Sequence, residues 1–203
     1  MNQLFLVSSC GFTRAGLEAL SRDWKMPTEV LSIRHPGQIL SAPPVSGNRL
    51  VLVSVPAESV AEAARGMLFW RQMELMRLEL AGAVFLRDVP CVLLGERSGR
   101  VLPEGSLWLS PAIPPAQLGV YLQQILRNAY LMVPECRNRN QLHLSQQQRA
   151  VMAACMSGEA VRETAVRLGL STHAVNCSRY TVMQRLGLRN RLELMSLSGS
   201  DVE

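Results

Sequence analysis

The sequence predicts two domains of different class, an α/β doubly wound domain followed by an all-α helix-turn-helix domain. Five apolar runs of strand length alternate with helical segments over the first part of the chain, which is typical of a parallel sheet. From Leu144 onward, apolar residues recur with helical spacing in four short segments. A polar run without periodicity lies between them and predicts a linker. We therefore expect domains at 1–133 and 144–198, joined by a linker at 134–143.

The N-terminal elements follow from the apolar runs and from the residues that interrupt them. We expect strands at 4–7, 30–33, 50–53, 89–94 and 107–109. Thr13 is expected to cap the first helix, and a further helix is expected over 116–128, after two prolines. The segment 36–47 contains three prolines and predicts a loop.

A long helix is expected over 58–80, because this stretch has no proline and many good helix formers. Its large apolar residues occupy more than one helix face: Met67, Leu68, Trp70, Leu75 and Leu78. One interpretation is a core helix with a broad apolar stripe. The other is a surface that binds a partner protein. The sequence leaves both interpretations open.

Capping residues mark the C-terminal helices. Ser145 is placed as an N-cap with Gln148 three residues later, which is the spacing of a capping box. Ser171 follows a glycine-containing turn and caps the third helix, and Asn190 caps the fourth. Two short helices joined by such a turn form a helix-turn-helix, whose second helix can enter the major groove of DNA.

Positive charge is concentrated in the C-terminal part of the chain. The net charge is +5, but residues 1–136 hold 12 basic and 11 acidic side chains, whereas residues 137–203 hold 9 and 5. The excess lies on the segment that the helical pattern assigns to DNA binding, where it favours a polyanion.

Cysteine and histidine placement predicts neither a metal site nor a cofactor. The five cysteines include no CxxC pair, and the three histidines are scattered. An odd number of cysteines, without a signal-peptide pattern, leads us to expect a cytoplasmic protein. No uncharged apolar run reaches the roughly 18 residues that a membrane helix needs. We expect a protein that is not an enzyme and does not bind a membrane.

The C-terminal segment resembles the LuxR/NarL-type (GerE-like) DNA-binding domain over its whole length, without a gap. The matching positions are Leu144-Ser145, Arg149, Val151, Gly158, Glu163, Ala165, Arg167-Leu168-Gly169, Leu170-Ser171, Val175, Arg179, Leu186-Gly187, Arg189-Asn190-Arg191 and Glu193-Leu194. The resemblance implies a sequence-specific transcription regulator that binds double-stranded DNA and is nucleoid-associated when bound.

The resemblance also implies which residues contact DNA. Four share one face of the recognition helix and are candidates to read bases: His173, Asn176, Cys177 and Tyr180. Three are candidates to hold phosphates: Arg162, Thr172 and Arg179. The alternative for each is a solvated helix face. The family usually carries lysine or threonine near His173 and Asn176, so fewer cations here predict weaker non-specific affinity.

Dimerisation is implied for the last helix, which in this family pairs across a two-fold axis. Leu192, Leu194 and Met195 are the candidates for this contact. Packing of the same residues against the first C-terminal helix is the alternative.

The N-terminal region resembles the receiver domain of a response regulator over about residues 3–130, through its first strand and helix and its last strand and helix. A working receiver needs acidic residues for Mg²⁺ and an acceptor aspartate. Here the acidic positions fall on Ser8 and Ser9 and the acceptor position on Ser54, while the family's hydroxyl position falls near Gly95 and its lysine position on Ser110. We therefore predict a pseudo-receiver that is not phosphorylated by this route. The short segment 96–106 also predicts that the usual fourth helix is missing.

Two functional hypotheses follow. The first is a DNA-binding transcription regulator that acts as a homodimer, or as a heterodimer with a response regulator. Degenerate receivers with a long third helix are loosely similar to the auxiliary regulators of the enterobacterial capsule (Rcs) system, which pair with a phosphorylatable partner. The alternative is an interaction protein that antagonises a response regulator without binding DNA strongly itself.

Overall fold

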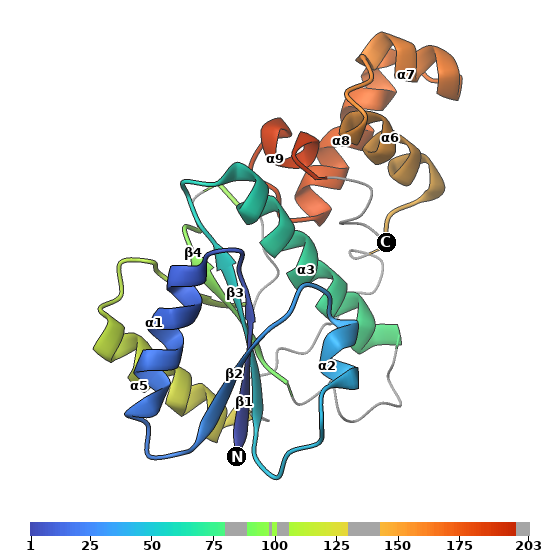
Figure 1. Ribbon diagram of the computed structural model, residues 1–203. Helices are drawn as coiled ribbons and strands as arrows, with labels where there is room; N and C mark the ends of the chain where they lie inside the picture. The colour runs from blue at the N-terminus through green and yellow to red at the C-terminus, as the bar shows by residue number, and fades with distance from the viewer. Residues whose placement is uncertain (80–88, 98, 101–105, 130–142, 198–203) are drawn as a thin grey trace.

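The computed structural model describes residues 1–79, 89–97, 99–100, 106–129 and 143–197. They form an α/β domain around a parallel sheet and a group of four helices beside it (Figure 1). This confirms the predicted combination of an α/β and an all-α domain. Apart from His143, the predicted linker 134–143 lies outside the described residues, as does the predicted end of the first domain.

Five parallel strands form the sheet in the order β2-β1-β3-β4-β5. They are β1 (Asn2–Val7), β2 (Thr28–Ser32), β3 (Arg49–Val55), β4 (Cys91–Gly95) and β5 (Leu107–Leu109). All five predicted strands are confirmed, with ends that differ from the prediction by at most two residues. Side chains alternate between the two faces: Leu4 and Leu6 belong to one apolar cluster, and Phe5 between them belongs to the other.

Helices cover both faces of the sheet (Figure 1). One face is covered by α1 (Gly11–Arg22) and α5 (Pro115–Arg127), and the other by α2 (Gly37–Ser41) and α3 (Val60–Glu79). The predicted helices at 58–80 and 116–128 are thus confirmed. In the part of 96–106 that the structure describes there is no helix between β4 and β5.

Two local predictions were wrong. The segment 36–47 is not entirely a loop, because α2 forms within it and buries Ile39 completely in the core. Thr13 does not cap α1, since that helix begins two residues earlier with Cys10 as its N-cap. In both cases the residues just before the helix carry no side-chain cap, so the sequence offered no signal for the true start.

The C-terminal domain consists of α6 (Gln146–Met156), α7 (Val161–Leu168), α8 (Thr172–Arg185) and α9 (Arg191–Met195). The predicted caps are confirmed. Ser145 and Gln148 form a capping box, Ser171 accepts from the amide of Ala174, and Asn190 accepts from the amide of Glu193.

The two domains are in contact, and the contact explains the broad apolar surface of α3. One side of this helix packs on β3, where Gly66 allows a close approach: a Cβ there would lie 2.4 Å from the carbonyl oxygen of Ser54. Another part of α3 contacts α9, and a single apolar cluster includes Met73 from α3 together with Val182 and Leu194 from the C-terminal domain. Met67, Leu68 and Trp70 are buried and Leu75 is half-buried, so this part of the helix is a core element between two domains, while the side chain of Leu78 lies outside the described residues.

Candidate nucleic-acid interface

A helix-turn-helix is formed by α7, a short turn and α8. Gly169 ends α7 with φ of +65°, a conformation that favours glycine. The amide of Leu170 donates to the carbonyl of Ala165 at 2.9 Å, which closes the turn. Beneath it, the side chains of Val151, Ala165 and Val175 are buried together. This small core fixes the angle between α7 and α8.

The four predicted base readers lie on one exposed face of α8. His173, Asn176, Cys177 and Tyr180 are all exposed, and Tyr180 keeps 59% of its surface accessible although it is large and aromatic. The structure therefore brings together the residues that the helical spacing placed on a common face. Figure 1 shows the α7 end of the helix-turn-helix projecting away from the sheet.

Polar contacts along α8 link each of these side chains to a neighbour on the same helix. The Arg179 guanidinium donates to Asn176 Oδ1 at 2.8 Å, and Gln184 donates to the Tyr180 hydroxyl at 2.7 Å. The sulfur of Cys177 lies 3.5 Å from His173 Nε2. The bonds span three or four residues on the helix surface, so they can exchange for bonds to a ligand without any change in the backbone.

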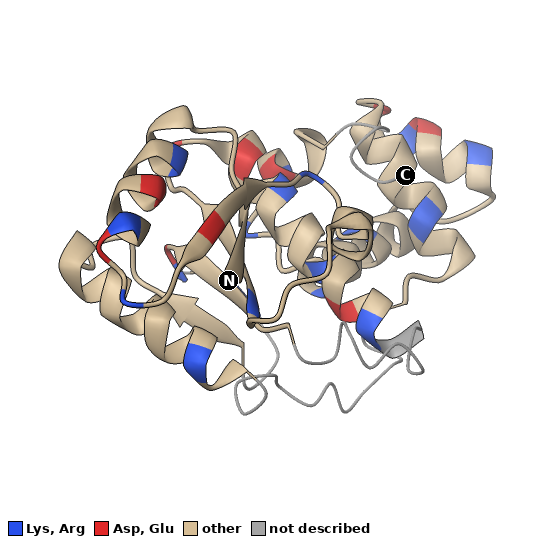
Figure 2. Ribbon diagram, turned by 60° about the horizontal axis from the view of Figure 1, so that its bottom comes forward, with Lys and Arg blue, Asp and Glu red and all other residues tan. Residues whose placement is uncertain are grey.

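The arginines of this domain differ in how far they are already paired. Basic residues predominate over acidic ones on these helices (Figure 2). Arg167 is paired with Glu159 at 2.7 Å, and Arg185 is held by the His143 carbonyl and by Gln148 Oε1 at 2.9 Å. Arg162 is exposed and makes no ion pair with any residue that the structure describes. It is thus available to a phosphate, as is the exposed Thr172 at the start of α8.

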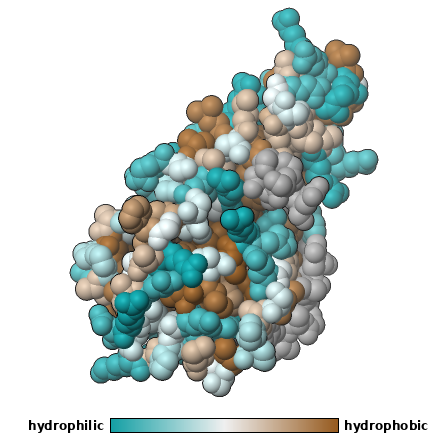
Figure 3. Space-filling view, in the orientation of Figure 1, coloured by the Kyte–Doolittle hydropathy of each residue, from teal (hydrophilic) through white to brown (hydrophobic). Residues whose placement is uncertain are grey.

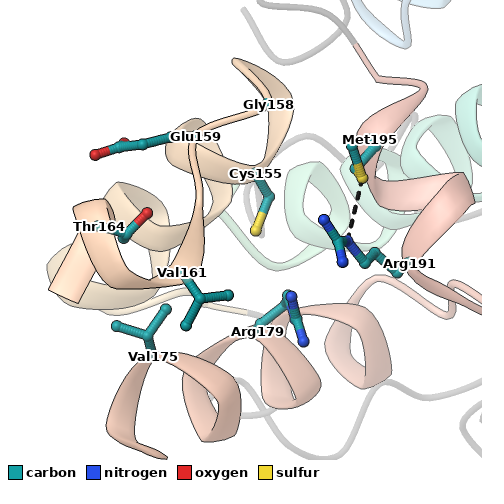
Figure 4. A pocket seen from close by; sticks show the side chains of 9 residues that line it. All are labelled: Cys155, Gly158, Glu159, Val161, Thr164, Val175, Arg179, Arg191 and Met195. Carbon is teal, nitrogen blue, oxygen red and sulfur yellow. Dashed lines mark hydrogen bonds between the residues drawn. The ribbon is translucent and has the colours of Figure 1, made fainter. Parts of the chain in front are cut away.

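Two guanidinium groups converge beside a half-buried thiol. Arg179 from α8 and Arg191 from α9 line a small pocket with Cys155 from α6, and Arg191 donates to the sulfur of Met195 at 3.2 Å (Figure 4). Burial raises the pKa of the Cys155 thiol, and the two arginines oppose that rise. The thiol is therefore protonated at neutral pH. Arg191 was not among the predicted contacts, since it stands in the capped turn of α9 rather than on the recognition helix.

The three residues predicted for dimerisation do not share a surface. Leu192 is 64% exposed and Met195 is 37% exposed on the outer face of α9. Leu194 is completely buried in the interdomain core. Figure 3 shows apolar side chains gathered over α9. The outer face of α9 is therefore carried by Leu192 and Met195, three residues apart, whereas Leu194 points toward the domain interior.

The serines predicted to replace the receiver's phosphoryl-transfer residues gather at the carboxyl edge of the sheet. Ser8 and Ser9 follow β1, Ser54 lies near the end of β3, and Ser110 follows β5. The carboxylate here comes from Glu62, in the first turn of α3, a residue that no sequence pattern singled out. It accepts from the Ser8 hydroxyl at 2.8 Å and from the Ser9 amide at 2.9 Å.

Glu62 is held ionised by these two serines. Burial alone would raise its pKa, but the hydrogen bonds from Ser8 and Ser9 outweigh burial and lower the pKa overall. One carboxylate is too little for a hard divalent cation. Among the residues that the structure describes, no group of three or more His, Cys, Asp or Glu side chains could hold a metal ion.

The helix-turn-helix has the arrangement of a DNA-binding motif, and it follows a domain built on a five-stranded parallel sheet. Residues 142–198 match the family described as bacterial regulatory proteins, luxR family, and this part of the chain is a luxR-type DNA-binding domain. No curated protein matched the sequence. No described helix is long and apolar enough to cross a membrane.

Several solved structures are similar over nearly the full chain. The response regulator StyR is 15% identical, with 96% of each chain covered and a TM-score of 0.44. RcsB from Salmonella enterica serovar Typhimurium, bound to the promoter P1flhDC, is 11% identical, with 95% of each chain covered and a TM-score of 0.49. FixJ from B. japonicum is 15% identical, with 95% of this chain and 93% of that chain covered and a TM-score of 0.36.

Proposed function

We propose that this protein is a sequence-specific transcription regulator that reads double-stranded DNA through the exposed face of α8. The observation that carries the proposal is the grouping of His173, Asn176, Cys177 and Tyr180 on one exposed face of α8, within the segment that matches the luxR family. An α-helix fits the major groove, where each base pair presents a distinct pattern of donors and acceptors. The protein has no catalytic role and needs no cofactor in this account, and it acts in the cytoplasm, where the chromosome lies.

Asn176 is the strongest candidate for direct base recognition. Its amide can donate and accept at once, and this pattern matches the edge of adenine. In the free protein its Oδ1 accepts from Arg179. On DNA, Arg179 exchanges that bond for a phosphate oxygen and frees Asn176 for the base. Arg162 and Thr172 hold the phosphates on either side and fix the register.

Selection of binding sites from a random DNA library tests this proposal. We expect an enriched consensus of two half-sites about one helical turn, roughly 10 base pairs, apart. The Asn176→Ala variant should relax the preference at one position of each half-site, whereas Gln124→Ala on the exposed side of α5 should select the same consensus. Failure of the unaltered protein to enrich any sequence would refute sequence-specific reading.

The receiver-like domain does not take part in phosphoryl transfer in this account. Acyl-phosphate formation needs a carboxylate acceptor and Mg²⁺, whereas serines stand at the strand ends and the nearby Glu62 is engaged by Ser8 and Ser9. Incubation with acetyl phosphate and Mg²⁺ should leave the mass of the intact protein unchanged. A stable, acid-labile adduct of one phosphoryl group would contradict this part of the proposal.

Dimerisation through the outer face of α9 completes the proposal. Leu192 and Met195 form its apolar centre, and the partner is either a second copy or a response regulator of similar build. Because Leu194 is buried within the chain, it supports this surface from beneath and does not contact the partner.

A second candidate function is favoured by the chemistry of the reading face. None of its four side chains carries a permanent positive charge, and this lowers the electrostatic part of DNA affinity. The protein would then pair with a response regulator and antagonise it, without binding DNA strongly. Site selection distinguishes the two functions, since an antagonist would enrich DNA only in the presence of the partner, or not at all.

A further inference from the structure

The loop after β4 reaches across to the C-terminal domain. Arg100 forms a two-pronged ion pair with Glu193 of α9, with Nη2–Oε1 at 2.7 Å and Nη1–Oε2 at 2.8 Å. Its Nη1 also donates to the carbonyl of Gly187, in the turn between α8 and α9, at 3.0 Å. The Arg100 side chain is 2% exposed and that of Glu193 is completely buried. This is a charged contact shielded from water between residues 93 positions apart.

Glu193 also organises the start of α9. The amide of Glu193 donates to the side chain of Asn190 at 3.1 Å, and its carboxylate accepts from the amide of Arg189 at 2.8 Å. The carboxylate therefore bonds both to the turn of its own domain and to Arg100. Since each Glu193 oxygen already has a donor, the buried charge is hydrogen-bonded as well as paired.

Two neighbours of Arg100, Gly99 and Glu96, also lie close to the C-terminal domain. Gly99 has φ of +74°, and a Cβ on it would lie 3.1 Å from the side chain of Arg189. Arg189 in turn lies 3.8 Å from the carboxylate of Glu96. Glycine at position 99 thus permits both the left-handed backbone and the close approach. Gly99 and Arg100 therefore lie against the turn between α8 and α9.

An apolar contact accompanies the ion pair. The α3–α9 packing places Met73, Leu188 and Leu194 in one buried cluster. A buried ion pair adds little net stability, because taking two charges out of water costs about as much as their attraction gains, yet removal of one partner is costly because it leaves an unpaired buried charge. Here the apolar contact between α3 and α9 stabilises the association of the two domains, and the ion pair fixes how they are positioned relative to each other.

We propose that Arg100 and Glu193 form an interdomain latch that holds the receiver-like domain and the C-terminal domain as one body. The latch engages the α8–α9 turn and leaves the face of α8 that carries Asn176 and Tyr180 exposed. It therefore sets the relative position of the domains without a phosphoryl group. The consequence for DNA, a reading face that is permanently uncovered, rests on the proposed function, whereas the latch itself is tested without DNA.

Charge reversal in the loop tests the latch. In the full-length Arg100→Glu variant, two buried carboxylates face each other, so small-angle X-ray scattering should give a larger radius of gyration and a longer maximum dimension, with unchanged helix content by circular dichroism. The matched control is Arg97→Glu, which makes the same charge change at an exposed position of the same loop. Its scattering should superimpose on that of the unaltered protein. If the Arg100→Glu curve also superimposed, the latch would be refuted.

The unaltered protein gives an independent answer should Arg100→Glu fail to fold. All three tryptophans, Trp24, Trp70 and Trp108, lie in the receiver-like domain, so the large change in their fluorescence marks the unfolding of that domain. Circular dichroism at 222 nm follows the helices of both domains. A latched protein unfolds in urea with coincident midpoints by the two probes. A separate helical transition that leaves the tryptophan signal unchanged would overturn the proposal.

Discussion

The carboxyl edge of the sheet and the outer face of α8 are both rows of polar side chains, but their bonding differs. At the edge, Ser8 and Ser9 are turned inward onto Glu62. On α8, Asn176 and Tyr180 are exposed and bonded only to neighbours on the same helix. The serines at the sheet edge donate to a carboxylate of the same domain. The side chains on α8 can exchange their present hydrogen bonds for hydrogen bonds to a ligand. We therefore place the proposed DNA-binding chemistry of this chain in the C-terminal domain.

The largest expected effect separates the two faces of α9. Leu194→Ala should lower the free energy of unfolding by about 2–5 kcal/mol, because it leaves a cavity in the interdomain core. Leu192→Ala removes the same atoms from a position that is exposed in the single chain, and at protein concentrations too low for dimerisation it should change stability by less than about 0.5 kcal/mol. Urea unfolding measures both. Equal losses for the two variants would mean that α9 does not dock as described.

The next effect concerns the reading face. Asn176→Ala should cost about 1–3 kcal/mol of binding free energy on the selected DNA site, since a two-bond contact to a base is lost. The same substitution should leave the urea midpoint almost unchanged, because the side chain is exposed. Competition titrations against the consensus and against a site changed at one base would measure the loss. An equal loss on both sites would assign Asn176 to the backbone instead.

A smaller effect distinguishes free from paired arginines. Arg162→Ala should reduce the slope of log K against log salt by about one unit, because one phosphate contact disappears. Arg167→Ala is the matched control on the same helix, and its side chain is already neutralised by Glu159. We expect it to change the slope much less. The same reduction in both variants would show that pairing within the protein does not decide which arginines contact DNA.

The smallest effect is expected at the sheet edge and depends on pH. The pKa of Glu62 is lowered in the folded protein, so its bonds to Ser8 and Ser9 stabilise the fold above the ordinary value of 4.5 and are lost as pH falls through the lowered folded pKa. Glu62→Gln lacks this contribution, which is below about 1 kcal/mol for a partly exposed group. Urea unfolding between pH 3 and pH 7 should show the two proteins converge in acid. A constant difference across that range would assign the loss to geometry instead of charge.

Local chemistry made much of the fold predictable. The caps at Ser145, Ser171 and Asn190 are properties of a few adjacent residues, and the structure confirms each of them. The helix α2 was missed because its evidence is tertiary: Ile39 is buried by the sheet, although Pro36 and its neighbours have the composition of a loop.

The candidate site also combines features that local sequence predicts with features that depend on tertiary contacts. The common face of His173, Asn176, Cys177 and Tyr180 follows from helical spacing alone. Contacts between distant segments cannot be predicted from helical spacing. Two examples are the hydrogen bond from Ser8 to Glu62 and the ion pair of Arg100 with Glu193. A carboxylate 54 residues from its donor, or 93 residues from its cation, leaves no periodic signal in the sequence.

The most direct test of the central claim is fluorescence anisotropy of the full-length protein against pooled genomic DNA fragments over a salt series. We expect saturable binding, with a slope of log K against log salt of several units that decreases in Arg179→Ala and is unchanged in Arg127→Ala on α5. Absence of binding even at low salt would contradict an autonomous DNA reader and would favour the antagonist of a response regulator.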